Sequence, residues 1–191
     1  MRTAFICLDL IHDIAHSEGK IPRNAAQINE RGVIDKVTRI LKIARDKKWL
    51  TIFVKVGYNS GYIDQPKDSP FFGRVHEIGA LDLNSIGTQF HSELDQKLVD
   101  LVVVKPRISA FYGTNLEAAL RAQKIERLVI AGVSTAWAVQ STVRDAHDRD
   151  YQVVVVEDAC AASSEVEHQQ SIGLLAAISR VCRTDDLQSL K

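Results

Sequence analysis

The sequence predicts a three-layer α/β/α fold with a six-stranded, mainly parallel sheet of the Rossmann-like kind. Short runs of Val, Ile and Leu alternate along the chain with longer amphipathic stretches, which is typical of strands that alternate with helices. The runs are largely apolar, as expected of parallel strands buried on both faces. With 191 residues, 46% of them hydrophobic, the chain can form one sizeable core, so we expect a single domain over residues 1–191.

The strands and helices can be placed in order. Six apolar runs predict strands, the last of them the weakest: Thr3–Leu8, Leu50–Val56, Leu101–Val104, Leu128–Ala131, Gln152–Val156 and Ile178–Cys182. Between the first two strands, apolar residues recur at helical spacing with basic residues on the opposite face, which predicts a helix around residues 33–45. The same reasoning predicts helices over Asn115–Ala122, Ala136–Arg149 and Glu165–Ala177.

One long stretch, from Gly57 to about Ser92, does not follow this regular pattern. It contains Pro66 and Pro70 together with several glycines. Loops of this length in compact domains are usually functional or disordered. We therefore expect this stretch to cover an active site or an oligomer interface.

Composition excludes several classes of function. The chain has 24 basic and 24 acidic side chains, so no net field draws it to nucleic acid or to an anionic membrane, and a small-molecule substrate fits better. No apolar run approaches the roughly 20 residues needed to span a bilayer, and the N-terminus lacks a signal-peptide core, so we expect a cytoplasmic protein. Apolar helix faces suggest a homo-oligomer, a dimer or a tetramer.

Three residues in the segments just after predicted strands are the candidates for chemistry. In open parallel sheets the ligand lies at the carboxyl ends of the strands. Asp9 follows the first strand, Lys105 follows the third, and Ala138 lies in the turn of helix after the fourth. Taken alone, the Asp could be a helix cap and the Lys a solvated side chain. Their joint placement favours a functional site.

The residues around these positions resemble the isochorismatase-like (cysteine) hydrolase superfamily. In that superfamily the fourth strand ends in Gly-Val-x-Thr and the next helix begins with x-x-Cys-Val, so Ala138 stands where the catalytic Cys is expected. The matching segments run through nearly the whole chain: Gly87–Leu94, Lys105–Leu116, Ala131–Val139, Thr142–Ala146 and Glu157–Cys160. The resemblance implies the isochorismatase-like fold, an Asp-Lys-Cys triad at Asp9, Lys105 and position 138, and a cis peptide at Val133–Ser134.

Two chemistries occur in this superfamily, and only one needs a thiol. In the amidase members the Asp is the base toward the Cys, the Lys ammonium favours both anions, and backbone N–H groups near the Cys hold the oxyanion. In isochorismatases a small residue replaces the Cys, and the Asp protonates the enol-pyruvyl carbon. We expect Cys-independent hydrolysis of a small molecule, with Asp9 as acid or base, Lys105 as its electrostatic partner and the backbone of Val133–Ala138 as an anion pocket.

The sequence leaves several alternatives open. Burial would raise the pKa of Asp9 and a nearby Lys105 would lower it, and the sequence does not decide between them. The chain has Ile11 where the family often has Gln, and its Gly132–Ala136 segment is typical of the amidase branch and of an uncharacterised Cys-less group. It is thus either a natural Cys-less hydrolase or a cysteine amidohydrolase whose nucleophile is replaced, naturally or by engineering. A third alternative is a non-catalytic binding protein whose pocket the Gly57–Ser92 loop fills.

Further side chains near the triad positions are candidates for binding the substrate or the oxyanion. They are Val133, Ser134, Thr135, Trp137, Arg107, Phe111 and Tyr112, although the aromatic ones could equally pack the core and Arg107 could form an ion pair. Cys7, Cys160 and Cys182 lack metal or disulfide spacing, and Cys160 is expected to be structural.

No cofactor or metal is predicted. The i, i+4 pair His12 and His16 lacks a third metal ligand, the stretch after the second strand lacks the Asp-x-His set of nicotinamidases, and a Gly-rich phosphate loop is missing. His168 is predicted to lie on a helix at a subunit contact.

Overall fold

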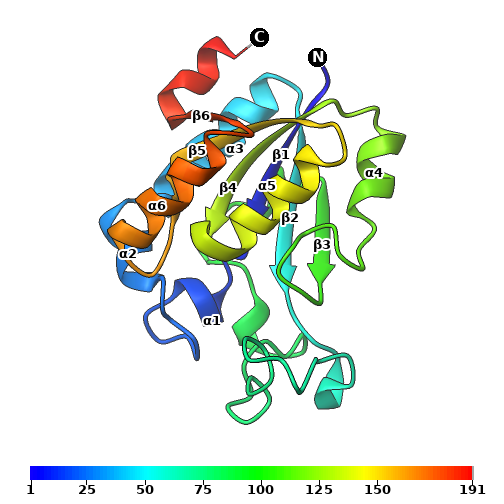
Figure 1. Cartoon of the computed structure of the whole chain (residues 1–191), viewed down its shortest axis with the longest axis vertical. Coiled ribbons are helices and arrows are strands. Elements are labelled where there is room, and N and C mark those ends of the chain that lie inside the picture. The colour runs from blue at the N-terminus through cyan, green and yellow to red at the C-terminus, as the bar shows by residue number, and fades with distance from the viewer. Residues whose placement is uncertain (191) are drawn as a thin grey trace.

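Six parallel strands form one continuous sheet in the computed structural model, which describes residues 1–190 (Figure 1). Their order across the sheet is β3-β2-β1-β4-β5-β6, and every neighbouring pair is parallel. The strands are β1 (Thr3–Leu8), β2 (Leu50–Val56), β3 (Leu101–Lys105), β4 (Arg127–Val133), β5 (Gln152–Ala161) and β6 (Arg180–Cys182). The predicted fold class is therefore confirmed.

The strand order reverses at the centre of the sheet. From β1 the chain adds β2 and β3 on one side, and from β4 it adds β5 and β6 on the other. In open α/β sheets such a reversal opens a crevice at the carboxyl ends of the two central strands, where ligands bind. The topology thus places the crevice beside the residues that follow β1 and β4.

Helices cover both faces of the sheet. They are α1 (His12–Ala15), α2 (Ala25–Glu30), α3 (Val33–Asp46), α4 (Leu116–Ala122), α5 (Gln140–His147) and α6 (Glu165–Leu175). The helix α3 lies behind the sheet and packs on β1, β2 and β5, whereas α5 and α6 lie in front of it (Figure 1). A turn of π-helix, Thr135–Val139, joins β4 to α5, and shorter 3₁₀ turns span Ser60–Tyr62, Ile86–Thr88, Gln96–Leu98 and Thr184–Ser189. No helix within residues 1–190 has the length and apolar character to cross a membrane.

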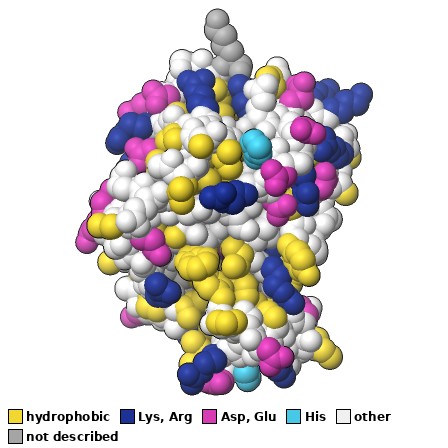
Figure 2. Space-filling view, in the orientation of Figure 1, with side chains coloured by type: hydrophobic (Ala, Val, Ile, Leu, Met, Phe, Trp, Pro, Cys, Tyr) yellow, Lys and Arg dark blue, Asp and Glu magenta, His cyan; other side chains and the backbone are white. Residues whose placement is uncertain are grey.

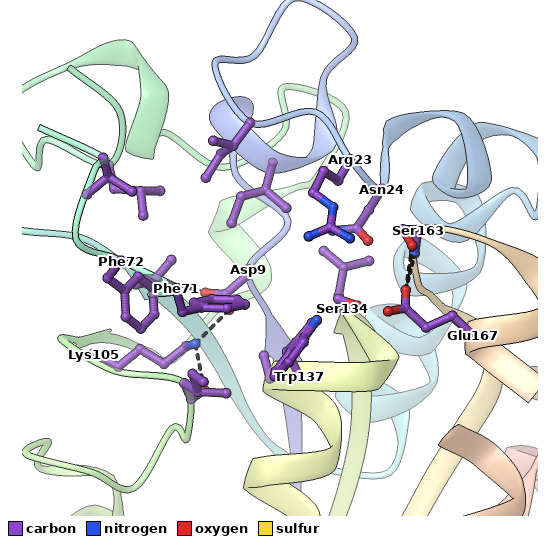
Figure 3. Close-up of a pocket in the computed structure, with 18 of the residues that line it drawn as sticks. Asp9, Arg23, Asn24, Phe71, Phe72, Lys105, Ser134, Trp137, Ser163 and Glu167 are labelled. Atoms are coloured by element: carbon purple, nitrogen blue, oxygen red, sulfur yellow. Dashed lines mark hydrogen bonds and ion pairs between the residues drawn. The ribbon is translucent and has the colours of Figure 1, made fainter. Parts of the chain in front are cut away.

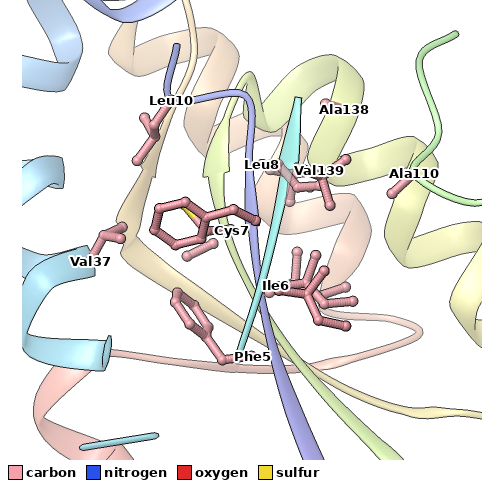
Figure 4. Packing of buried hydrophobic residues seen from close by; sticks show 14 of the residues in the cluster. Phe5, Ile6, Cys7, Leu8, Leu10, Val37, Ala110, Ala138 and Val139 are labelled. Carbon is pink, nitrogen blue, oxygen red and sulfur yellow. The ribbon is translucent and has the colours of Figure 1, made fainter. Parts of the chain in front are cut away.

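The hydrophobic core is centred on β1, whose six residues are all buried. Phe5 and Cys7 point toward the α3 side, where Val37 packs, and Ile6 and Leu8 point toward Val139 on the other side (Figure 4). Burial on both faces explains why the strand reads as an uninterrupted apolar run.

Four strands have other bounds than the apolar pattern predicts. β3 and β4 are longer by one and three residues, and the differences at β5 and β6 have structural causes. β5 continues five residues beyond Val156, because its two acidic residues have partners elsewhere in the chain. Glu157 forms an ion pair with Arg31 at 3.0 Å. Asp158 accepts hydrogen bonds from the N–H and the hydroxyl of Thr184. β6 begins at Arg180, two residues later than predicted, because the chain leaving α6 first makes a turn.

The stretch after β2 lies below the carboxyl ends of the strands (Figure 1). The buried Asp13 carboxylate of α1 accepts a hydrogen bond from the Leu81 N–H at 2.8 Å. A Cβ built on Gly87 would lie 2.1 Å from the same carboxylate, so only glycine lets this segment approach α1 so closely. Ile11 and Phe90 add an antiparallel bridge. These contacts fix residues 57–92 as one wall of the crevice.

Candidate active site

A cavity of about 240 Å³ occupies the crevice at the carboxyl ends of the central strands. Its walls come from the strand ends, from α1 and the segment after it, from residues 70–81, and from the turn after β4 (Figure 3). In the space-filling view, hydrophobic side chains gather between the sheet and the 57–92 stretch (Figure 2). The predicted residues that line the cavity are Asp9, Lys105, Val133, Ser134, Trp137 and Ala138.

Asp9 and Lys105 form a buried ion pair at the base of this cavity. The Lys105 Nζ lies 2.7 Å from the Asp9 Oδ2, and the two side chains are only 2% and 4% exposed. The second carboxylate oxygen of Asp9 accepts a hydrogen bond from the Val56 N–H at 2.8 Å. Lys105 also donates to the Ile108 carbonyl at 2.8 Å. Asp9 has a left-handed backbone with φ of 52°, a conformation in which strain is often held at functional sites.

Burial is the largest influence on the pKa of Asp9. Desolvation raises the pKa of this carboxyl above its ordinary value, although the Lys105 ammonium and the Val56 N–H both lower it. Of the two opposing influences that the sequence left undecided, burial is therefore the larger, and it moves the pKa of Asp9 upward. An Asp in this environment holds a proton at higher pH than a solvated one, as a general acid requires.

The turn after β4 brings Ala138 into the cavity. The Val133–Ser134 peptide is cis, as the resemblance implies, and Ala138 is almost fully buried while still lining the cavity. Gly132 precedes the turn with φ of 114°, and a Cβ there would lie 2.2 Å from the Leu8 carbonyl oxygen, so β4 needs glycine where it passes β1. The Ser134 hydroxyl is buried and has no hydrogen-bond partner among the described residues. This hydroxyl can therefore donate a hydrogen bond to a ligand in the cavity.

Three aromatic rings form one side of the cavity. Phe71 lies 4.9 Å from the Trp137 ring and 4.8 Å from Phe72, measured between centroids. Phe71 and Trp137 are both nearly half exposed, so they lie where the cavity meets solvent (Figure 3). Trp137 was predicted, but the two phenylalanines were not, because they lie in an irregular stretch without a recognisable motif.

The opposite side of the cavity is polar. Arg23, Asn24, Ser163 and Glu167 lie there, and the Glu167 carboxylate accepts hydrogen bonds from the Ser163 N–H at 2.9 Å and from its hydroxyl at 2.6 Å (Figure 3). Arg23 and Asn24 precede α2, a helix too short to leave a periodic signal in the sequence. A substrate in this cavity would thus lie between an aromatic side and a polar side.

Four predicted site residues lie outside the cavity lining. Thr135, the first residue of the turn, is fully buried. Arg107 donates to the Asp64 and Pro106 carbonyls, Phe111 packs in the core against Tyr151, and Tyr112 is 60% exposed. After Lys105 the chain turns away from the cavity, and Ile108 is the residue of that segment that lines it.

None of the three cysteines of the chain lines the cavity. All three are buried, and burial raises the pKa of Cys160 to about 12 and that of Cys182 to about 11. Burial also raises the pKa of Cys7 well above its ordinary value. These thiols stay protonated, so none of them replaces the nucleophile absent at Ala138.

The two histidines that were predicted to lack a third metal ligand are both partly buried. His12 and His16 stack with ring centroids 4.8 Å apart, and His91 lies 6.2 Å from His16. Within residues 1–190, no group of three or more His, Cys, Asp or Glu side chains is arranged to hold a metal ion.

Known proteins are similar in sequence to nearly the whole of this chain. The Isochorismatase domain family matches residues 3–186. The chain is 29% identical over 189 residues to the uncharacterized isochorismatase family protein YecD of Escherichia coli O157:H7, covering 97% of this chain and 94% of that protein. It is also 29% identical over 172 residues to the ureidoacrylate amidohydrolase RutB of Methylorubrum extorquens, covering 82% and 68%.

Solved structures have the same fold. The crystal structure of an isochorismatase family protein from Desulfovibrio vulgaris superposes with a TM-score of 0.87 at 22% identity, covering 98% of this chain and 97% of that one. This superposition shows the fold, and the family match over residues 3–186 covers nearly the whole sequence. The chain belongs to the isochorismatase family.

Proposed function

We propose that this protein hydrolyses a small molecule with Asp9 and Lys105 and without a thiol nucleophile. The observation that supports the proposal most directly is the lining of the cavity. A buried carboxyl–ammonium pair lies there together with the methyl group of Ala138, and the cysteines lie elsewhere. A methyl group cannot attack a carbonyl carbon, so the reactive group of the cavity is the Asp9 carboxyl.

The geometry suits acid catalysis of vinyl-ether cleavage. Protonated Asp9 donates its proton to the terminal carbon of the C=C bond, and water adds to the resulting oxocarbenium carbon. The hemiketal then collapses to an alcohol and a carbonyl product, and a proton returns to Asp9. Positioned acids of this kind contribute about 10²- to 10⁴-fold to the rate. Lys105 stabilises the carboxylate that forms, and the Ser134 hydroxyl with the backbone of the turn binds an anionic group of the substrate.

An amidohydrolase that has lost its nucleophile is the second candidate. The similarity to a ureidoacrylate amidohydrolase and the amidase-type sequence of Gly132–Ala136 favour it. In that case the same Asp9 would serve as the base for a thiol at position 138. A non-catalytic binding protein is less well supported, because side chains of the Gly57–Ser92 stretch line the cavity and leave about 240 Å³ open.

A turnover screen tests the proposal. The chain as it stands is incubated with isochorismate, with other vinyl ethers and with a panel of amides and ureides, and product is followed by mass spectrometry. We expect turnover of a vinyl ether. Asp9→Asn protein purified in parallel controls for contaminating hydrolases. Amide turnover by the unmodified chain would contradict the proposal.

The pH dependence distinguishes an acid from a base. If catalysis requires protonated Asp9, kcat/KM is highest below the pKa of this residue and falls as pH rises through it. Burial raises that pKa above the ordinary 3.8, so we expect the decline at higher pH than a solvated Asp would give. The measurement is kcat/KM across the pH range in which the protein stays folded. A rate that rises with pH through this region would assign Asp9 the role of a base.

A further inference from the structure

A buried polar cluster lies directly behind the turn that carries Ala138. His168 of α6 is fully buried within the chain, and its Nδ1 lies 2.8 Å from the Thr135 Oγ1. Its Nε2 lies 2.9 Å from the Arg31 guanidinium and 3.5 Å from a Glu157 carboxylate oxygen. This histidine was predicted at a subunit contact, but both of its ring nitrogens face groups of its own chain.

The partners of His168 assign its protons. A guanidinium only donates hydrogen bonds, so the Nε2 that faces Arg31 at 2.9 Å must present a lone pair. A neutral imidazole then carries its proton on Nδ1 and donates it to Thr135. Burial and the Arg31 charge lower the pKa of His168, while Glu157 and Glu165 raise it, and the net lowering favours this neutral form.

Arg31 is itself held from three directions. Its guanidinium donates to the Glu157 carboxylate at 3.0 Å, to the Glu165 carboxylate at 2.7 Å and to the Cys160 carbonyl at 2.9 Å. It therefore connects the end of α2 to β5 and to the start of α6. Through His168 these contacts extend to Thr135, the first residue of the turn.

Thr135 follows Ser134, which lines the cavity, and lies three residues before Ala138. The backbone between Val133 and Ala138 is the anion pocket of the proposed function. We propose that His168 is a positioning residue for this pocket, because its Nδ1–H fixes the Thr135 hydroxyl and thereby the turn. The catalytic part of this inference rests on the proposed function, whereas the proton assignment and the geometry of the turn do not.

Two amide substitutions at His168 separate its two hydrogen bonds. In His168→Asn the side-chain amide N–H occupies the place of Nδ1 and keeps the bond to Thr135. In His168→Gln the amide oxygen reaches the place of Nε2 and keeps the bond to Arg31. We expect His168→Asn to retain kcat within a few-fold, and His168→Gln to lower kcat about 10-fold or more with little change in KM. A merely structural role would lower kcat equally in both variants and overturns the inference.

Nuclear magnetic resonance gives a readout that does not depend on turnover. The ¹⁵N spectrum of the imidazole should show His168 protonated on Nδ1 near neutral pH. Amide resonances of Ser134 and of Ala136–Ala138 should move further in His168→Gln than in His168→Asn, and further in Thr135→Val than in Thr135→Ser. A proton on Nε2, or unchanged turn resonances in His168→Gln, would overturn the inference. If these spectra are observed but no turnover can be measured, the proposed function fails and the inference about His168 and the turn stands.

Discussion

Replacing Asp9 with Asn is expected to abolish turnover and to lower the free energy of unfolding by about 3 to 5 kcal/mol. The amide cannot deliver the proton that the reaction needs. It also leaves the Lys105 ammonium, which is 2% exposed and 2.7 Å from the carboxylate in the intact protein, buried without a counter-charge. The two effects are measured separately, kcat with the substrate found in the screen and the free energy of unfolding by urea titration at neutral pH.

Lys105→Met provides the matched control for the ion pair. It removes the ammonium but leaves a carboxyl that can become neutral, because burial already raises the pKa of Asp9. We therefore expect it to cost less stability than Asp9→Asn while still losing most activity. The double variant Asp9→Asn/Lys105→Met should regain much of the stability and none of the activity. Strictly additive stability losses, or turnover by any variant with Asn at position 9, would contradict this account of the site.

The sheet could be predicted closely because its strands are buried on both faces. β1 and β2 begin and end at the predicted residues, since apolar runs and buried strands coincide there. β5 shows where this reasoning fails. Its last five residues include Glu157 and Asp158, which read as the end of a strand, and only their distant partners Arg31 and Thr184 let the strand continue.

The site residues that could be predicted are those that come after strands in the sequence. Asp9, Lys105 and Ala138 come together because the carboxyl ends of parallel strands share one edge of the sheet. Phe71 and Arg23 belong to irregular segments, and long-range contacts place them at the cavity. No local pattern in the sequence carries that information.

Residues near the site in sequence can still be absent from it. Phe111 follows Lys105 by six residues within a matching motif, yet it packs against Tyr151 in the core. The motif here stabilises the loop that carries Lys105: Ser109 hydrogen-bonds the Asp145 carboxylate, and the Thr142 hydroxyl accepts from the Ala110 N–H at 3.1 Å. A motif therefore identifies a segment as belonging to the site without saying which of its side chains face the substrate.

Ala138→Cys is expected to create a reactive thiol where the protein as it stands has none. The new side chain would line the cavity beside the Asp9–Lys105 pair, whereas the three natural cysteines are buried with raised pKa values. A thiolate near an ammonium is stabilised, so we expect iodoacetamide to modify position 138 at least about 10-fold faster than any other cysteine. Peptide mapping after a short exposure measures this directly.

Ala138→Ser is the control, since it adds a group of similar size that is a much weaker nucleophile. The amide and ureide panel then separates the two candidate reactions. The thiol of Ala138→Cys could react with iodoacetamide and still cleave no amide. In that case the other residues of the cavity do not support amide hydrolysis, which agrees with acid catalysis by Asp9. Amide turnover by Ala138→Cys, with no vinyl-ether turnover by the unmodified chain, would instead identify an amidohydrolase that lacks only its nucleophile. In that protein Asp9 would be the base that deprotonates a thiol at position 138.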